Sequence, residues 1–285
     1  MAATGRPGSH SRSAETTQME HPSPNLGQCS DGRVVRIEFR DPARRNALDA
    51  DALARFVAEV RATAENQRCD LLLLSGEGSA FCAGFDLAGC AEEPRRVETL
   101  LSLLSEAMAA LRALDIPVVA RVQGAALAGG CAILTGCDFV VVARDAQIGY
   151  PVHRIGISPA VSAPSLLSRM GPAARALMMS NDLLDGPSAL ACGLATHCVD
   201  ASALDAEVET LVARLLAKGP QAMRATKRWI REIESRMPGD LGATPPRGPL
   251  AMAAARGASM ELAAGDEFAS MLRTFWASRT QRTAR

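Results

Sequence analysis

Aromatic side chains are scarce in this sequence, where seven Phe, two Trp and one Tyr make up only 4% of the chain. The base-stacking ladders of single-strand nucleic-acid binders are therefore not expected. An excess of charge is missing too, because 31 basic and 31 acidic side chains cancel to a formal net charge of +0. Without a basic field, neither nucleic acid nor an anionic membrane surface is an expected partner.

Long apolar runs and metal-binding spacings are also lacking. No stretch reaches the roughly 18 uninterrupted apolar residues of a membrane span, because Arg121, Gln123 and Asp138 interrupt the longest candidate. The eight cysteines form no C-x-x-C pair and are expected to be reduced core residues. The four histidines lie too far apart for a zinc motif. We therefore expect a soluble, cytoplasmic protein without a metal site.

Composition and periodicity divide the 285 residues into three parts. Residues 1–29 are rich in Ser, Thr, Pro and Gly without hydrophobic periodicity, which is typical of a disordered N-terminal arm. Residues 30–200 are expected to form an α/β core, and residues 201–285 a helical C-terminal region. A Gly- and Pro-rich loop at 238–249 interrupts this last part.

Strands and helices are expected to alternate within the core. Apolar residues on every second position from Arg33 predict an edge strand, and Asp49 is placed to cap a helix that runs to about Asn66. A continuous apolar run at 71–74 predicts a strand buried on both faces, and similar apolar segments predict further strands at 117–122 and 139–142. This alternation favours a mainly parallel sheet with right-handed crossovers. Beyond about residue 160, helices are predicted at 162–170, 172–180, 187–192, 203–217, 220–235 and 251–278.

Two glycine-containing segments, 78–87 and 124–130, directly follow buried strands. The carboxyl ends of parallel strands are where α/β sheets usually hold ligands. Gly129 opens a helix, so its N–H has no partner within that helix. Two such amides from separate loops could hold the oxygen of a carbonyl that becomes an enolate or a tetrahedral oxyanion. Each cluster taken alone is weak evidence and is better explained by tight turns and close packing. Neither matches G-x-G-x-x-G, the P-loop or G-x-S-x-G.

Taken together, these segments resemble the signature of the crotonase (enoyl-CoA hydratase/isomerase) superfamily. The matching stretches, in order, are PARRNAL at 42–48, AFCAGFDL at 80–87, IPVVA at 116–120, LAGGC at 127–131, CDF at 137–139 and IGYP at 148–151. The resemblance covers roughly residues 33–235. It implies a spiral of ββα units, a homotrimer or a dimer of trimers, and a coenzyme A thioester as the ligand. No separate cofactor is implied, since coenzyme A is part of the substrate.

The resemblance also assigns roles to individual residues. The backbone N–H groups of Phe85 and Gly129 would form an oxyanion hole for the thioester carbonyl. Arg44 and Arg45 lie where family members contact the coenzyme's phosphates or adenine, although exposed loop arginines are as often simply solvated. The other positions expected at the substrate are Ala47, Ala83, Asp86, Leu87, Ala132, Pro151 and Val152. Asp86 would equally serve to cap a helix or order its loop.

The sequence departs from the family pattern at two positions. Hydratases of the family use a pair of glutamates to position and activate water, and this chain has Ala132 and Val152 there. The paired acid and base that water addition needs are therefore missing. Tyr150 and His153 are the alternative acid/base candidates. If residue 152 faces the pocket of an extended chain, residue 153 faces away, so a surface or hydrogen-bonding role is the alternative for His153.

The expected function is that of an acyl-CoA-processing enzyme, a lyase or isomerase of fatty acid metabolism that stabilises a thioester enolate without being a standard hydratase. Double-bond shift, decarboxylation and thioester hydrolysis are the candidate reactions. The alternative is a non-catalytic acyl-CoA-binding or structural subunit. A nucleotide-dependent oxidoreductase is disfavoured because its glycine fingerprint is absent.

Overall fold

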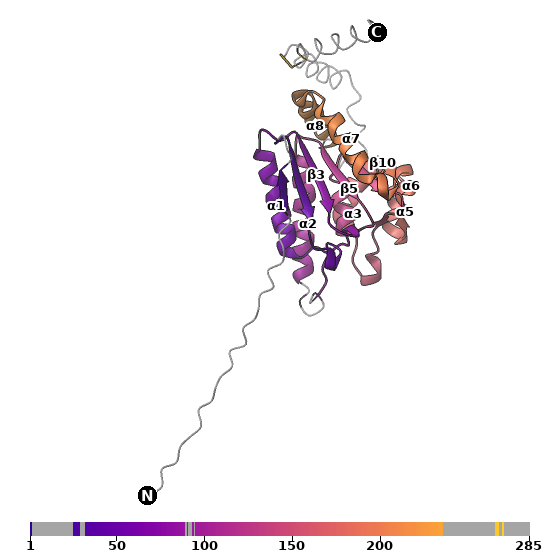
Figure 1. Ribbon diagram of the computed structural model, residues 1–285. Coiled ribbons are helices and arrows are strands. Elements are labelled where there is room, and N and C mark those ends of the chain that lie inside the picture. Colours follow the sequence, from indigo (N-terminus) through magenta and orange to yellow (C-terminus); the bar gives the residue numbers. More distant parts are fainter. Residues whose placement is uncertain are drawn as a thin grey trace.

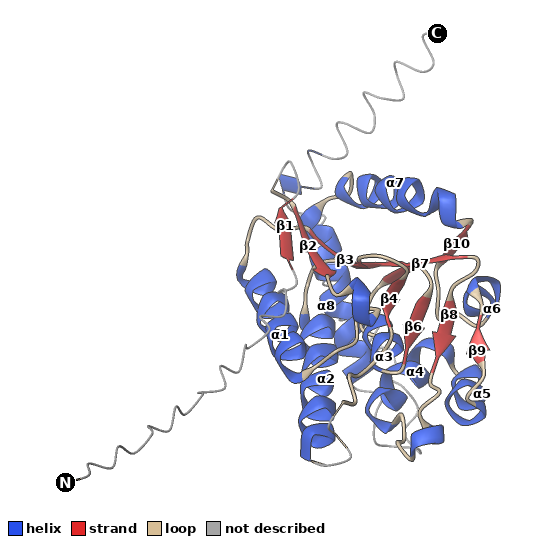
Figure 2. Cartoon of the chain, turned by 60° about the horizontal axis from the view of Figure 1, so that its bottom comes forward, coloured by secondary structure: helices blue, strands red, loops and turns tan. Residues whose placement is uncertain are grey.

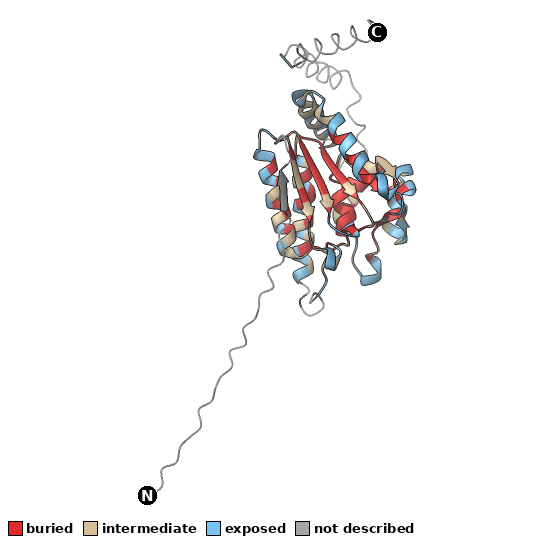
Figure 3. Ribbon diagram, in the orientation of Figure 1, coloured by how far each residue is buried: buried red, intermediate tan, exposed pale blue. Residues whose placement is uncertain are grey.

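The computed structural model describes residue 1 and residues 25–28, 32–88, 90, 93, 95–235, 266–267 and 270 (Figure 1). The rest of the predicted N-terminal arm and most of the predicted helix at 251–278 lie outside these residues. Within the described part, two β-sheets are surrounded by helices, and the central strands are largely buried (Figure 3). The mixed α/β class expected from the sequence is confirmed.

The larger sheet has six strands, and all but one of them run parallel. Their spatial order is β1 (Asn25–Gln28), β2 (Val34–Phe39), β3 (Leu71–Gly76), β5 (Val118–Val122), β7 (Phe139–Ala143) and β10 (His197–Val199). β1 pairs antiparallel with β2, whereas every other neighbouring pair is parallel. The first four leucines of β3 are buried on both faces, as their continuous apolar run predicts.

A second, smaller sheet lies beside the first (Figure 2). Its order is β4 (Ala80–Cys82), β6 (Ala125–Leu127), β8 (Gln147–Gly149) and β9 (Leu183–Leu184). β4, β6 and β8 each follow one strand of the larger sheet, namely β3, β5 and β7. The chain therefore alternates between the two sheets and carries a helix after each of the first two strand pairs, which makes the expected succession of ββα units.

Three helices follow strands in the first half of the described chain. α1 (Ala50–Glu65) begins where Asp49 accepts a hydrogen bond from the Ala52 amide at 2.8 Å, so the predicted N-cap is confirmed. α2 (Arg95–Ala113) packs against α1, and the two helices lie side by side in Figure 1. α3 (Gly129–Leu134) is short and wholly buried. α3 contacts α2 and the strands β4 and β6 of the smaller sheet, so its N-terminus is held in one position.

The second half of the described chain is helical, as predicted. It forms α4 (Ala163–Met170), α5 (Ala173–Ser180), α6 (Gly186–Ala191), α7 (Leu204–Leu216) and α8 (Pro220–Ser235). α7 covers one face of the larger sheet with Leu204, Val208, Leu211 and Val212, which pack against buried residues of β2, β3, β5 and β7. Helix and sheet thus share one apolar cluster there.

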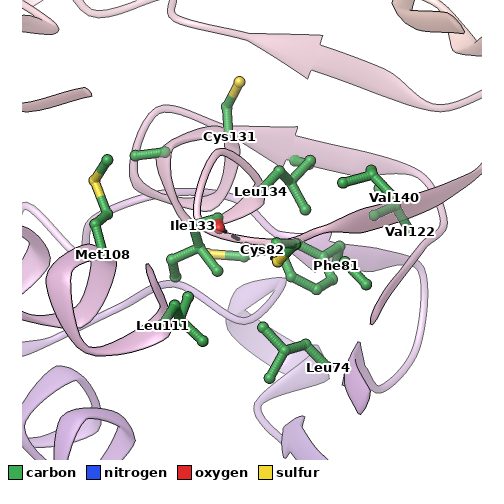
Figure 4. Packing of buried hydrophobic residues seen from close by; sticks show 14 of the residues in the cluster. Leu74, Phe81, Cys82, Met108, Leu111, Val122, Cys131, Ile133, Leu134 and Val140 are labelled. Carbon is green, nitrogen blue, oxygen red and sulfur yellow. Dashed lines mark hydrogen bonds between the residues drawn. The ribbon is translucent and has the colours of Figure 1, made fainter. Parts of the chain in front are cut away.

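The main core fills the space on the other side of the larger sheet. Phe81 of β4 packs edge-on against Phe39 of β2, with ring centroids 5.5 Å apart. Around it lie Ile133 and Leu134 of α3 and Leu111 of α2 (Figure 4). This core connects the sheets to α3, so the loop that precedes α3 rests on a close-packed base.

Two local features differ from the sequence prediction. Residues 25–28 of the expected arm form β1, so pairing begins before Arg33 and β2 is not an edge strand. A strand with one apolar residue among Asn, Gly and Gln has no alternation by which to predict it. Residues 153–155 form a 3-10 helix, η2 (His153–Ile155), where an extended chain was expected.

Candidate active site

An apolar cavity of about 160 Å³ lies at the N-terminus of α3. The segment after β4, the start of α3, the inner face of α2 and residues 150–162 form its walls. Among the described residues that line it, none carries a charge. The lining residues are Ala83, Phe85, Leu87, Leu101, Leu104, Leu127, Ala128, Gly129, Ala132, Tyr150, Pro151, Val152, Ile155, Ile157, Ser158, Pro159, Val161 and Ser162.

Phe85 lines one side of this cavity. Phe85 sits in an isolated parallel bridge with Leu48. The bridge is made by the neighbours of Phe85: the Leu48 amide donates to the Gly84 carbonyl at 2.7 Å, and the Asp86 amide donates to the Leu48 carbonyl at 2.9 Å. The N–H of Phe85 itself has no acceptor among the described residues.

The Gly129 amide lies close by. Gly129 is the first residue of α3, so no intrahelical acceptor exists for its N–H, and none is found elsewhere among the described residues. A Cβ added to Gly129 would lie 3.1 Å from Cε1 of Phe85, which shows how closely the two residues pack. Phe85 and Gly129 thus both line the apolar cavity, and neither backbone N–H has an acceptor among the described residues.

The residues immediately before Phe85 and Gly129 both have positive φ angles. Gly84 has φ +100°, and a Cβ there would lie 3.1 Å from the Leu127 carbonyl oxygen, so glycine is required. Ala128 has φ 49°, an unusual angle for a residue with a side chain, and one that costs about 1–3 kcal/mol. Strain of this kind is retained when the surrounding structure holds it, which fits a backbone whose direction matters.

Ala132 and Val152 are both buried at the cavity, with 1% and 8% of their surface exposed. Neither side chain can donate or accept a proton. Among the described lining residues, Tyr150 has the one side chain that can act as an acid or base, and 2% of its surface is exposed. Its Oη has no hydrogen-bond partner among the described residues, an arrangement that costs about 1–3 kcal/mol. Burial raises the pKa of Tyr150 well above its ordinary value.

His153 does not reach the cavity. It lies in η2 with an exposed side chain, and its Nδ1 is 3.2 Å from Oδ1 of Asn181. Val152 is buried and His153 exposed, as expected, although η2 rather than an extended chain separates them. The geometry therefore favours the surface hydrogen-bonding role for His153.

The two arginines differ in environment. Arg44 pairs with three carboxylates: Asp41 and Asp86, both at 2.6 Å, and Asp49 at 3.4 Å. Arg44 and Asp86 line a second, more open hollow of about 500 Å³. Arg45 is exposed, with φ 54°. Of the thirteen predicted site residues, eight line the apolar cavity and two line this hollow, while Arg45, Ala47 and His153 line neither.

A comparison with known proteins decides the family. The model of the enoyl-CoA hydratase/isomerase family matches residues 30–238. The chain belongs to this family. It is 32% identical over 204 residues to the crotonyl-CoA hydratase of Syntrophomonas wolfei, covering 70% of this chain and 78% of that protein. It is 29% identical to the 2,3-dehydroadipyl-CoA hydratase of Escherichia coli, covering 71% and 80%. Enoyl-CoA hydratase from Mycobacterium smegmatis superposes with a TM-score of 0.80 at 26% identity, over 90% of this chain and 97% of that one.

Within this family member, two polar side chains that carry no predicted role organise the loops of the site. Nδ2 of buried Asn46 donates to the carbonyls of Glu77 at 3.0 Å and Ala80 at 2.8 Å, and its Oδ1 accepts from the Asp41 amide at 2.8 Å. Nε2 of Gln123 donates to the carbonyls of Gly76, Gly78 and Ala80. An Asn inside the apolar end of PARRNAL is a signal that could have indicated the first of these.

The cavity walls that come from α2 and from 155–161 were also not predicted. Leu101 and Leu104 lie about one helical turn apart on α2, Ile157 lies in a loop and Val161 lies in the 3-10 helix η3 (Ala160–Ser162), so only tertiary structure brings them together. Among the described residues, no group of three or more His, Cys, Asp or Glu could hold a metal ion. Nor does any helix of the described chain have the length and apolar character to cross a membrane.

Proposed function

We propose that this chain is an acyl-CoA-processing enzyme that stabilises a thioester enolate between the amides of Phe85 and Gly129, and that it is not a standard hydratase. The observation that carries the proposal is the pair of unengaged amides at an apolar cavity from which carboxylates are absent among the described lining residues. Relatives named as hydratases of crotonyl-CoA and 2,3-dehydroadipyl-CoA support the substrate class.

The chemistry follows from where charge develops. When a thioester loses a proton or a carboxyl group next to its carbonyl, negative charge moves onto the carbonyl oxygen. Two N–H donors aimed at that oxygen stabilise it, and one such donor contributes about 2.7–4 kcal/mol in enzymes where it has been removed. The apolar walls strengthen this effect because they exclude water.

The side chains at 132 and 152 limit which reactions can follow. Water addition needs a base for the water and an acid for the α-carbon, and Ala132 and Val152 supply neither. Decarboxylation needs no protein base, because breaking the bond to the departing CO₂ leaves its electron pair on the enolate. Double-bond shift and thioester hydrolysis also require fewer protein carboxylates than hydration does. Of the two acid/base candidates, only Tyr150 lines the cavity.

A second candidate function is a non-catalytic acyl-CoA-binding or structural subunit. It is favoured by the scarcity of titratable groups at the cavity, where the only candidate acid is a tyrosine whose pKa burial has raised. Both functions are proposed for a homotrimer or a dimer of trimers in the cytoplasm. Contacts of Arg44 and Arg45 with the coenzyme's phosphates belong to the same proposal, and they would require the ion pairs of Arg44 to rearrange.

The deciding experiment measures turnover of the purified protein on a panel of acyl-CoA thioesters by mass spectrometry. Crotonyl-CoA hydration at ordinary hydratase rates would contradict the argument from Ala132 and Val152. Turnover of any other thioester supports the enzyme, and binding without turnover across the panel supports the second candidate.

A matched pair of variants tests the amide itself. Gly129→Ala and Gly129→Pro introduce the same Cβ beside Phe85, but only proline removes the N–H. Proline is accepted at the first position of a helix. We expect turnover to survive partly in the alanine variant and to be lost in the proline variant, with circular dichroism confirming that both fold.

A further inference from the structure

The hydroxyl of Tyr150 is buried on a mainly apolar wall whose other polar side chains, among the described lining residues, are Ser158 and Ser162. Its Oη makes no hydrogen bond of acceptable geometry with any described residue, although Ser162 and Cys131 lie near enough to influence it. The neighbouring Ser162 hydroxyl donates to the Pro159 carbonyl at 3.1 Å, so its own proton is already engaged. Cys131, which is also buried, lies beside the phenolic oxygen of Tyr150. Since buried hydroxyls are almost always paired in folded proteins, a missing partner here points to a ligand.

The protonation state defines what that ligand must offer. Burial keeps the Tyr150 phenol neutral over the physiological range. A neutral phenol presents one O–H donor, and it seeks an acceptor oxygen. The same protonation state makes Tyr150 a poor general base.

The lack of charged side chains among the described lining residues disfavours a carboxylate as the acceptor. No described lining residue is a cation, so a carboxylate on the acyl group would be buried without a counter-ion. A plain hydrocarbon chain would fill the cavity but leave Oη unpaired. An uncharged acyl group that bears a hydroxyl or keto oxygen satisfies both the apolar walls and the phenol.

We infer that Tyr150 is a specificity-determining residue, whose hydroxyl donates a hydrogen bond to a neutral oxygen of the acyl group beyond the thioester carbonyl. This inference rests on the proposed acyl-CoA function and narrows it to oxygenated, uncharged acyl groups. Tyr150 thereby discriminates between acyl groups of the same length, and the Leu, Ile and Val walls contribute to the binding of all of them.

The test compares affinities by isothermal titration calorimetry. The probes are butyryl-CoA, its 3-hydroxy, 4-hydroxy and 3-oxo forms, and succinyl-CoA as the charged analogue. We expect one oxygenated form to bind about five- to tenfold more tightly than butyryl-CoA, as one net hydrogen bond allows, and succinyl-CoA to bind more weakly than either. In Tyr150→Phe this preference disappears while butyryl-CoA affinity is retained.

Two controls separate recognition from stability. Tyr150→Phe removes only the unpaired hydroxyl, so its midpoint of thermal unfolding should stay level or rise; a hydroxyl with a structural role would lower it. Ser162→Ala removes the adjacent hydroxyl and should keep the preference. Equal binding of oxygenated and plain thioesters, or a preference that persists in Tyr150→Phe, overturns this inference alone. Failure of every thioester to bind overturns the proposed function and this inference with it.

Discussion

The ring of Phe85 packs directly against Gly129, where an added Cβ would lie 3.1 Å from Cε1 and 3.3 Å from Cδ1. One residue follows β4 and the other is the first residue of α3, so this contact joins two segments that line the cavity. The ring of Phe85 can pack this closely because residue 129 has no side chain.

Replacing the ring tests that contact. Phe85→Ala keeps the backbone N–H but removes the ring, so residues 85 and 129 lose the packing contact between them. We expect acyl-CoA turnover to fall about tenfold or more, since small displacements at a reacting centre are costly. The half-buried ring should contribute about 1–3 kcal/mol to folding, less than a fully buried Phe, as urea titration would measure. Phe85→Leu is the matched control and should lose less of both; equal losses would contradict the packing role.

Asn46 is expected to be essential for the loop before α1. Asn46→Ala leaves the Glu77 and Ala80 carbonyls and the Asp41 amide without their partner. The residue also has φ 58°, which asparagine tolerates better than alanine. We expect the free energy of unfolding to fall by about 2–4 kcal/mol. Arg45→Ala provides the control, because the neighbouring residue has a similar φ of 54° but an exposed side chain. A comparable loss in both variants would assign the effect to backbone strain alone.

Arg44 and Asp86 should be energetically coupled. Their side chains meet at 2.6 Å and are each partly exposed, so the pair is screened by solvent. A double-mutant cycle with Arg44→Ala and Asp86→Ala should yield a coupling energy of about 1 kcal/mol from chemical denaturation. High salt should reduce it. Additive effects of the two substitutions would show that the pair contributes nothing, and Arg44→Lys should fail to restore the paired geometry.

Glu59 should make the protein less stable as the pH rises. Burial raises the pKa of Glu59, and its Oε2 has no partner among the described residues. A carboxyl whose pKa is higher in the folded state contributes stability below its ordinary pKa, and this contribution is lost as the pH rises through the folded-state value. Glu59→Gln, which mimics the protonated form, should therefore be more stable than the parent near neutral pH. The difference should vanish in acid below the ordinary value of about 4.3. A pH-independent difference in unfolding midpoints would contradict this.

Much of the fold follows from local patterns in the sequence. The leucine run of β3, the cap at Asp49 and the helical spacing in α1 each act within a few residues, so each could be predicted from the sequence alone. β4, β6 and β8 have three residues each, too few for any alternation to appear. The second sheet was therefore expected only from the family resemblance and not from periodicity.

The candidate active site was less predictable from the sequence than the fold was. The loop position of Phe85 and the helix start at Gly129 can be recognised in sequence because glycines and strand ends mark them. The partners of Arg44 could not be, because Asp86 lies 42 positions along the chain and only folding brings its carboxylate within reach. Likewise, nothing local indicates that Leu104 of α2 and Tyr150 line the same cavity.

Two different parts of the molecule determine what happens at this cavity. In the proposed function, the backbone turns with positive φ at Gly84 and Ala128 would orient the amides of Phe85 and Gly129. The side chains of Ala132 and Val152 lie at the cavity and form no hydrogen bonds with the rest of the structure. An ancestor could therefore change its reaction by exchanging two side chains while the backbone stayed the same, and a designer could attempt the reverse by placing glutamates at those positions.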